Sequence, residues 1–143
     1  MLYQSLQHSK DEQLAAIAVK ALKEVDYHLK WSKEWVIRLG DGTEESHQRM
    51  QKAVNELWSY TGELFIANDT DKIILQSGVG VDISSLKQQW MDYAGNVFAE
   101  AGIVMPKTSW MQQGGKEGRH SEHLGYVLAE LQFMQRAYPG MEW

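Results

Sequence analysis

Apolar residues recur every three to four positions along the first part of the chain, which is the spacing of one helix face. They are Leu14, Ile17, Ala18, Ala21, Val25, Leu29, Val36 and Leu39. Ser9 or Asp11 can cap the amino end of this helix, and Gly40 ends it in the turn that follows. About thirty residues at ~1.5 Å per residue make a rod of about 45 Å, which favours a helical bundle.

Three further helices are predicted from the same spacing. They cover residues 43–65, 84–98 and 121–138. Thr43 caps the second helix, and the short turn before it makes the first two helices antiparallel neighbours. Residues 66–84 form a connection with a β-like run from Ile73 to Leu75, and residues 102–118 form a second loop. The pattern therefore predicts an all-α protein with long antiparallel helices.

Composition narrows the class of protein. With 143 residues the chain is long enough for one compact domain, so we expect a single domain over residues 1–143. The net charge of −5 argues against a nucleic-acid partner, and the absence of cysteine excludes disulfides and thiolate metal sites. No apolar run reaches the ~18–20 residues of a membrane span, and no signal peptide is recognisable. We therefore expect a cytoplasmic protein without a membrane or nucleic-acid partner.

Histidines that follow a carboxylate by three residues are the first candidates for metal binding. On a helix this spacing places both side chains on one face, as in the Glu-x-x-His pairs of di-iron bundles. Glu44 and His47 have the spacing, but they lie in a first helical turn, where a charge arrangement at the helix end is the favoured interpretation. Glu117 and His120 also have it, but Gly118 stands between them and makes a helix there doubtful.

Glu24 and His28 form a different pair, four residues apart and both on the apolar side of the first helix. One interpretation is a core histidine satisfied by a hydrogen bond, and this is favoured for a lone histidine on an apolar face. The other interpretation is a metal ligand. Val25, three residues before His28, cannot bind iron, so the pair lacks the Glu-x-x-His pattern.

The segment GGKEGRHSE, residues 114–122, combines glycines with Lys116, Arg119 and the start of a helix. Exposed backbone amides and the helix dipole both favour an anion, so a ligand phosphate or a partner carboxylate could bind here. A flexible glycine loop with solvated charges is the alternative, and it is the favoured one.

The chain resembles a known family, the C subunits of bacterial phenylacetyl-CoA epoxidases. The stretches that carry the resemblance are LAAIAVKALKEVDYHLKWSKEWVIRLGDGTEES, QRMQKAVNELWSYTGELF and GRHSEHLGYVLAELQFMQRAYPG. The resemblance spans essentially the whole chain. It implies a ferritin-like helical bundle of which this chain holds the second, C-terminal part, because the helices that come first in that family are absent here.

The resemblance also implies a role. In such an enzyme the A subunit holds a di-iron centre and epoxidises the ring of phenylacetyl-CoA, a reductase supplies electrons from NADPH, and the C subunit supports the A subunit. We therefore expect a non-catalytic structural subunit or fragment in aerobic phenylacetate breakdown, with no cofactor in this chain. Glu24 and His28 would be vestigial ligand positions, and Lys116 and Arg119 possible contacts to CoA or to a partner.

Two alternatives stay open: a ferritin-like di-iron oxygenase subunit with its own metal site, and a helical protein–protein interaction module. Without the missing helices, wide apolar stripes on residues 14–39 and 50–64 need to be covered. We therefore expect self-association, or pairing with a chain that supplies the missing half, in addition to pairing with the catalytic A subunit.

Overall fold

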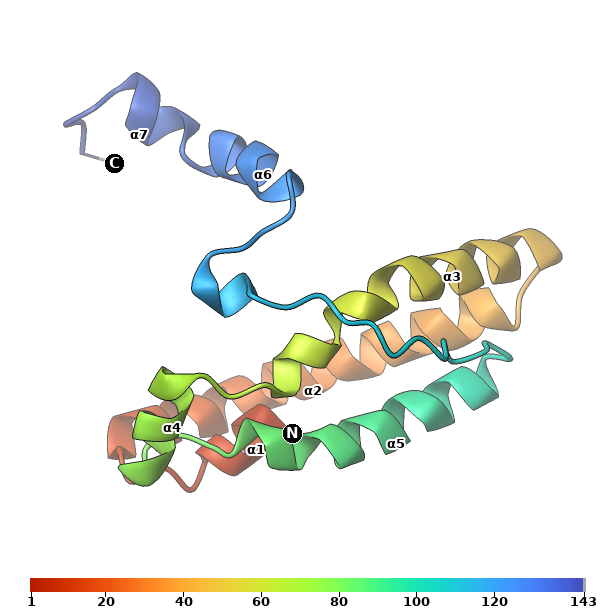
Figure 1. The fold of residues 1–143 in the computed structure, drawn as a ribbon, viewed down its shortest axis with the longest axis horizontal. Helices are drawn as coiled ribbons and strands as arrows, with labels where there is room; N and C mark the ends of the chain where they lie inside the picture. The colour runs from red at the N-terminus through yellow and green to blue at the C-terminus, as the bar shows by residue number, and fades with distance from the viewer. Residues whose placement is uncertain (143) are drawn as a thin grey trace. The chain divides into compact units, whose positions relative to one another are not determined.

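The computed structural model describes residues 1–142, which form α-helices, short 3₁₀-helices and loops without a strand (Figure 1). The all-α prediction is therefore confirmed for the part of the chain that is described. Contacts divide the chain between residues 112 and 113 into two compact units. A single domain over residues 1–143 stays a prediction. No helix in residues 1–142 is both long and apolar enough to cross a membrane.

The longest element is α2, Glu12–Gly40, which follows a short helix, α1, Leu2–Leu6, that the apolar pattern did not predict. Of the two candidate caps, Asp11 is the N-cap, because its side chain accepts a 2.9 Å hydrogen bond from the amide of Leu14. Capping by a short acidic side chain satisfies one of the amides that a helix start leaves unpaired. The predicted end of the helix at Gly40 is confirmed.

The second long element is α3, Glu44–Leu57, which runs antiparallel to α2 (Figure 1). Thr43 caps it as predicted, since the amide of Ser46 donates a 3.2 Å hydrogen bond to the Thr43 hydroxyl. Both the antiparallel pair and the cap at its turn are thus confirmed.

The predicted extension of this second helix to Phe65 is wrong. After α3 the chain tightens into two 3₁₀ helices, η1, Trp58–Tyr60, and η2, Gly62–Phe65. The hydroxyl of Thr61 donates a 2.8 Å hydrogen bond to the carbonyl oxygen of Trp58. A local side-chain bond of this kind, followed by a glycine, competes with the backbone ladder of an α-helix.

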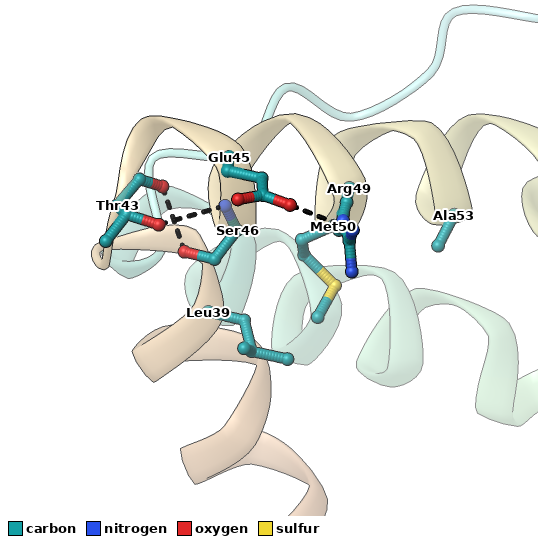
Figure 2. Close-up of a pocket in the computed structure, with 7 residues that line it drawn as sticks. All are labelled: Leu39, Thr43, Glu45, Ser46, Arg49, Met50 and Ala53. Carbon is teal, nitrogen blue, oxygen red and sulfur yellow. Dashed lines mark hydrogen bonds and ion pairs between the residues drawn. The ribbon is translucent and has the colours of Figure 1, made fainter.

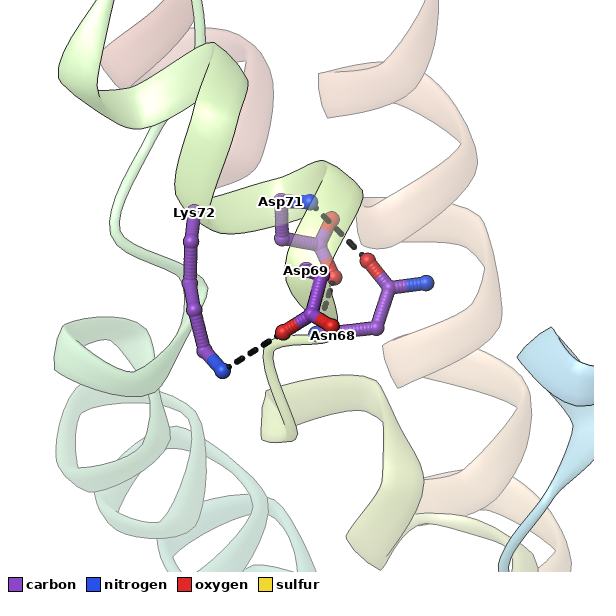
Figure 3. A network of polar contacts seen from close by, with 4 residues as sticks. All are labelled: Asn68, Asp69, Asp71 and Lys72. Atoms are coloured by element: carbon purple, nitrogen blue, oxygen red, sulfur yellow. Dashed lines mark hydrogen bonds and ion pairs between the residues drawn. The ribbon is translucent and has the colours of Figure 1, made fainter.

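The predicted β-like run from Ile73 to Leu75 is also wrong, because these residues lie in helix α4, Asp69–Gln76. A capping box starts this helix (Figure 3). The amide of Asp71 donates to the side chain of Asn68, and the amide of Asn68 donates to the side chain of Asp71, both at 2.9 Å. Two amides satisfied at the helix start outweigh the local β preference of an Ile-Ile-Leu run.

Helix α5, Leu86–Glu100, packs against α2 within the first unit. The predicted helix from about Ser84 is confirmed, with one 3₁₀ turn, η3, Ile83–Ser85, before it. Gly40 permits the close approach of the two helices, since a Cβ there would collide with the carbonyl oxygen of Ala101. The same corner is closed by His47, whose Nδ1 lies 2.7 Å from the carbonyl oxygen of Gly40. A carbonyl only accepts, so Nδ1 carries the proton.

An irregular segment follows α5, and we call its residues 104–112 the strap. The side-chain amide of Gln51 holds one end, because it donates to the carbonyl oxygen of Val104 at 2.9 Å and accepts from the Val104 amide at 2.8 Å. At the other end, the amide of Gln112 donates to the carbonyl oxygen of Ser59 at 2.8 Å. The strap is therefore fixed to α3 and to η1.

The second unit begins at Gln113. It contains η4, Gly115–Glu117, and the helices α6, His123–Leu131, and α7, Phe133–Ala137. The continuous helix predicted over residues 121–138 is therefore wrong. It is broken at Gln132, whose φ of −101° and ψ of 2° leave the α-helical region.

Buried apolar residues are few among residues 1–142, and all of them belong to the first unit. They are Ala18, Trp58, Val97, Ala101 and Ile103. Many large apolar side chains remain exposed, in α2 as well as in the second unit. So much uncovered apolar surface is typical of a chain that associates with other protein.

Candidate functional site

One face of α2 carries apolar side chains that the first unit does not cover. We call it the α2 stripe, and its residues, spaced by three or four, are Ile17, Ala21, Glu24, His28, Trp31, Trp35 and Leu39. Ile17 is 53% exposed, Trp31 56% and Trp35 42%. The rings of Trp31 and Trp35 meet edge to face, with centroids 6.1 Å apart. The polar pair Glu24 and His28 separates the apolar residues at the two ends of the stripe. An exposed helix face with this much apolar surface is a candidate protein interface.

Glu24 and His28 lie in the middle of the α2 stripe. His28 Nε2 is 4.0 Å from Glu24 Oε1, and the two side chains are 65% and 76% exposed. The expectation that they face the packed core is wrong for this chain, because α2 packs through a different face, the one with Ala18, which is fully buried. At 4.0 Å the contact is too long for a hydrogen bond, and an exposed ion pair of this kind adds little stability.

The α2 stripe continues into a hollow of about 500 Å³ at the corner between α2 and α3 (Figure 2). Leu39, Met50 and Ala53 contribute its apolar lining. Glu45 and Arg49 also line it and form a 2.8 Å ion pair on the exposed side of α3. Because Leu39 belongs to both the stripe and the hollow, the apolar surface runs from α2 onto α3.

The other carboxylate–histidine pairs do not converge. Glu44 and His47 bond different partners, Gln48 and Gly40. Glu117 is the last residue of η4, and Gly118 follows with a φ of 86°, so Glu117 does not share a helix with His120. The interpretation of Glu44 and His47 as a helix-end arrangement agrees with these contacts.

Lys116 lies in η4, and Arg119 follows that helix after a single glycine; both side chains are exposed. Gly114, with a φ of 98°, turns the chain so that its carbonyl oxygen accepts a 2.8 Å hydrogen bond from the amide of Arg119. Helix α6 begins only at His123, so neither cation lies in its first turn. A contact of Lys116 and Arg119 with CoA or with a partner stays a prediction.

Comparison with known proteins places the chain in a family. All of it, residues 1–143, matches the family of phenylacetic acid catabolic proteins, and the chain belongs to that family, which has a ferritin-like helical fold. It is 46% identical, over 99% of its own length, to the C subunit of the 1,2-phenylacetyl-CoA epoxidase of Escherichia coli strain K12. The chain spans 57% of the length of that relative. The resemblance seen in the sequence and the predicted fold class are both confirmed.

The described residues do not fit the di-iron centre of ferritin-like oxygenases. Within residues 1–142 there is no group of three or more His, Asp or Glu side chains that could hold a metal ion. Glu24 and His28 bring two ligand types to one place, but Val25 stands where the Glu-x-x-His pattern requires a glutamate.

Proposed function

We propose that this chain is a non-catalytic structural subunit, or part of one, of a multicomponent phenylacetyl-CoA epoxidase that acts in aerobic phenylacetate breakdown. It packs against and supports the catalytic A subunit, which holds the di-iron centre, and it works with that subunit in the cytoplasm. The 46% identity to the C subunit of such an enzyme supports the assignment to the complex.

The α2 stripe is the observation that carries the supporting role. Its tryptophans are about half exposed, and removing apolar surface from water stabilises an assembly by about 25 cal/mol per Å². The first unit does not cover the stripe, so an assembly with another protein that covered it would be stabilised in this way. We propose that a chain equivalent to the unmatched part of the relative covers the stripe. When no such chain is present, a second copy of this chain covers it instead.

The lack of a fitting metal site supports the non-catalytic part of the proposal. A di-iron centre takes carboxylates and histidines from several helices at once. Glu24 and His28 supply only one such pair, so Val25→Glu alone would not create the centre. We propose that the pair is vestigial and that, once the stripe is covered, the two side chains are paired with each other rather than with iron.

A co-purification experiment tests the proposed function. The full chain, carrying an affinity tag, is co-expressed with the A subunit, and epoxidation of phenylacetyl-CoA is measured with the reductase added. The proposal expects the A subunit to co-purify and to be more active with the chain than without it. A folded chain that does not retain the A subunit would instead favour an unrelated helical interaction module.

A further inference from the structure

The first unit contains a second hollow, bounded by η1, η2, the start of α5 and the strap. Its volume is about 330 Å³, which is within the ~300–1,000 Å³ range of small-molecule sites. Aromatic rings line it: the centroid of Trp90 lies 5.6 Å from that of Trp58 and 5.5 Å from that of Phe65. Trp58 is only 5% exposed, so this wall is held by the core. The hollow therefore offers a fixed apolar wall on which a flat ring can stack.

The opposite wall of the hollow is the strap, and it is also held in place. The side-chain amide of Gln51 and the backbone carbonyl of Ser59 fix its two ends through hydrogen bonds to the strap backbone. Between those ends Met111 packs on Gly62, where a Cβ would come within 2.7 Å of the Met111 Cγ. A hollow with both walls fixed is pre-formed, so ordering its walls would cost little of the binding free energy.

The rim of the hollow is positively charged. Lys87 from α5 and Lys107 from the strap line it, and no acidic side chain does. Within residues 1–142 neither lysine forms an ion pair, and both are exposed. Two ammonium groups beside an aromatic wall suit a ligand that is negatively charged at one end and flat at the other.

We propose that this hollow binds a small organic anion that carries an aromatic ring. The ring stacks on Trp90, which rests on the buried Trp58, and the anionic group pairs with Lys87 and Lys107. A free aromatic carboxylate has this chemistry, and so does the purine and phosphate end of a nucleotide. The proposal goes beyond the supporting role and does not rest on it, because the hollow lies away from the α2 stripe and shares no residue with it.

The test titrates the full chain with three probes and follows the indole N–H signals of Trp58 and Trp90 by NMR. Phenylacetate represents the carboxylates, AMP represents the nucleotides, and phenylacetamide is the neutral match of phenylacetate. We expect at least one of the two anions to shift both signals, and phenylacetamide to bind at least ten times more weakly than phenylacetate if phenylacetate is the anion that binds.

Lysine variants test the charge. Lys87→Gln combined with Lys107→Gln should weaken binding of the anion about tenfold, since each exposed charge pair contributes a modest amount. Lys20→Gln combined with Lys23→Gln removes two exposed lysines of α2 and should leave binding unchanged.

Four results would overturn the proposal. The first is that neither anion shifts the two indole signals. The second is that the Lys87 and Lys107 variant binds the anion as tightly as the unchanged chain. The third is that phenylacetamide binds as tightly as phenylacetate, which would reduce the hollow to a general apolar patch. The fourth is that the signals shift only when the A subunit is added, which would make the hollow a protein interface.

Discussion

Replacing both Trp31 and Trp35 with alanine tests whether the α2 stripe is an interface. The two rings touch each other and lie in the carboxyl-terminal half of the stripe. They are 56% and 42% exposed, so the chain by itself leaves about half of each side chain uncovered. If another protein surface covers the stripe, the exposed half of each ring is buried.

The expected magnitude follows from that exposed area. A tryptophan buries ~150–250 Å² when fully covered, so the two together have about 150–250 Å² left to bury. At ~25 cal/mol per Å² this corresponds to at most about 4–6 kcal/mol. Interface residues that dominate binding contribute about 2–4 kcal/mol when truncated. We therefore expect the double substitution to weaken association by about 2–4 kcal/mol, which is roughly 30- to 1,000-fold in Kd.

Light scattering after size exclusion, over a range of protein concentrations, measures the effect. The unchanged chain should self-associate at micromolar concentration, and the Trp31→Ala, Trp35→Ala variant should be largely monomeric there. Val19→Ala is the matched control, because Val19 is 50% exposed on the opposite side of α2, and it should associate like the unchanged chain. A monomeric unchanged chain, or a double variant that associates as tightly as it, would refute the interface.

Three further substitutions test the fold. Gly40→Ala should lower the free energy of unfolding by about 1–3 kcal/mol in urea, because the new Cβ collides with a backbone carbonyl at the end of α5, whereas Gly125→Ala meets nothing and should be neutral or stabilising. Asn68→Ala removes the capping box of α4 (Figure 3) and should cost about 1 kcal/mol, visible as faster hydrogen exchange in α4; unchanged exchange would contradict the capping role. The hydrogen bond and charge of Lys72 lower the pKa of Asp69, so Lys72→Gln should raise that pKa in an NMR titration. Since the folded pKa is the lowered one, the contact stabilises above the ordinary pKa of Asp69 and is lost as the pH falls through the folded value.

The long helices could be predicted from the sequence. Where helix and strand preferences compete within a few residues, the pattern did not predict the outcome. The apolar repeat of α2 and α5 runs over several turns, and α2 also has a side-chain cap at Asp11, so the pattern alone identifies both helices. In α4 the run from Ile73 to Leu75 has the residue types of a strand. The side chains of Asn68 and Asp71, at the start of the helix, stabilise the helical conformation instead. The reciprocal spacing of a capping box was the signal that could have found this helix.

The face of α2 that packs could not be read from the sequence. Apolar residues occupy two sides of this helix, one with the buried Ala18 and one with the exposed Trp31 and Trp35. Periodicity shows that both sides are apolar but not which of them meets another helix, so it does not reveal that His28 faces away from the core. The choice depends on contacts with α3 and α5, which are remote in sequence.

The hollow beneath the strap was also beyond the sequence pattern. Its outer wall depends on the bond between Gln51 and Val104, which are 53 positions apart. No local sequence motif predicts that a glutamine side chain will bond the backbone of a residue so far along the chain. Trp58 and Trp90 are each visible as apolar helical positions, but their convergence with Lys87 and Lys107 emerges only in the folded chain.

The most direct test of the structural, non-catalytic role is iron analysis of the co-expressed complex. The full chain is co-expressed with the A subunit, the complex is purified, the two chains are separated without chelators, and iron is measured for each by elemental analysis. We predict that the A subunit retains close to two iron atoms per chain, as a di-iron centre requires, and that this chain retains almost none. Close to two iron atoms per copy of this chain would contradict the account and make it an oxygenase subunit with a metal site of its own.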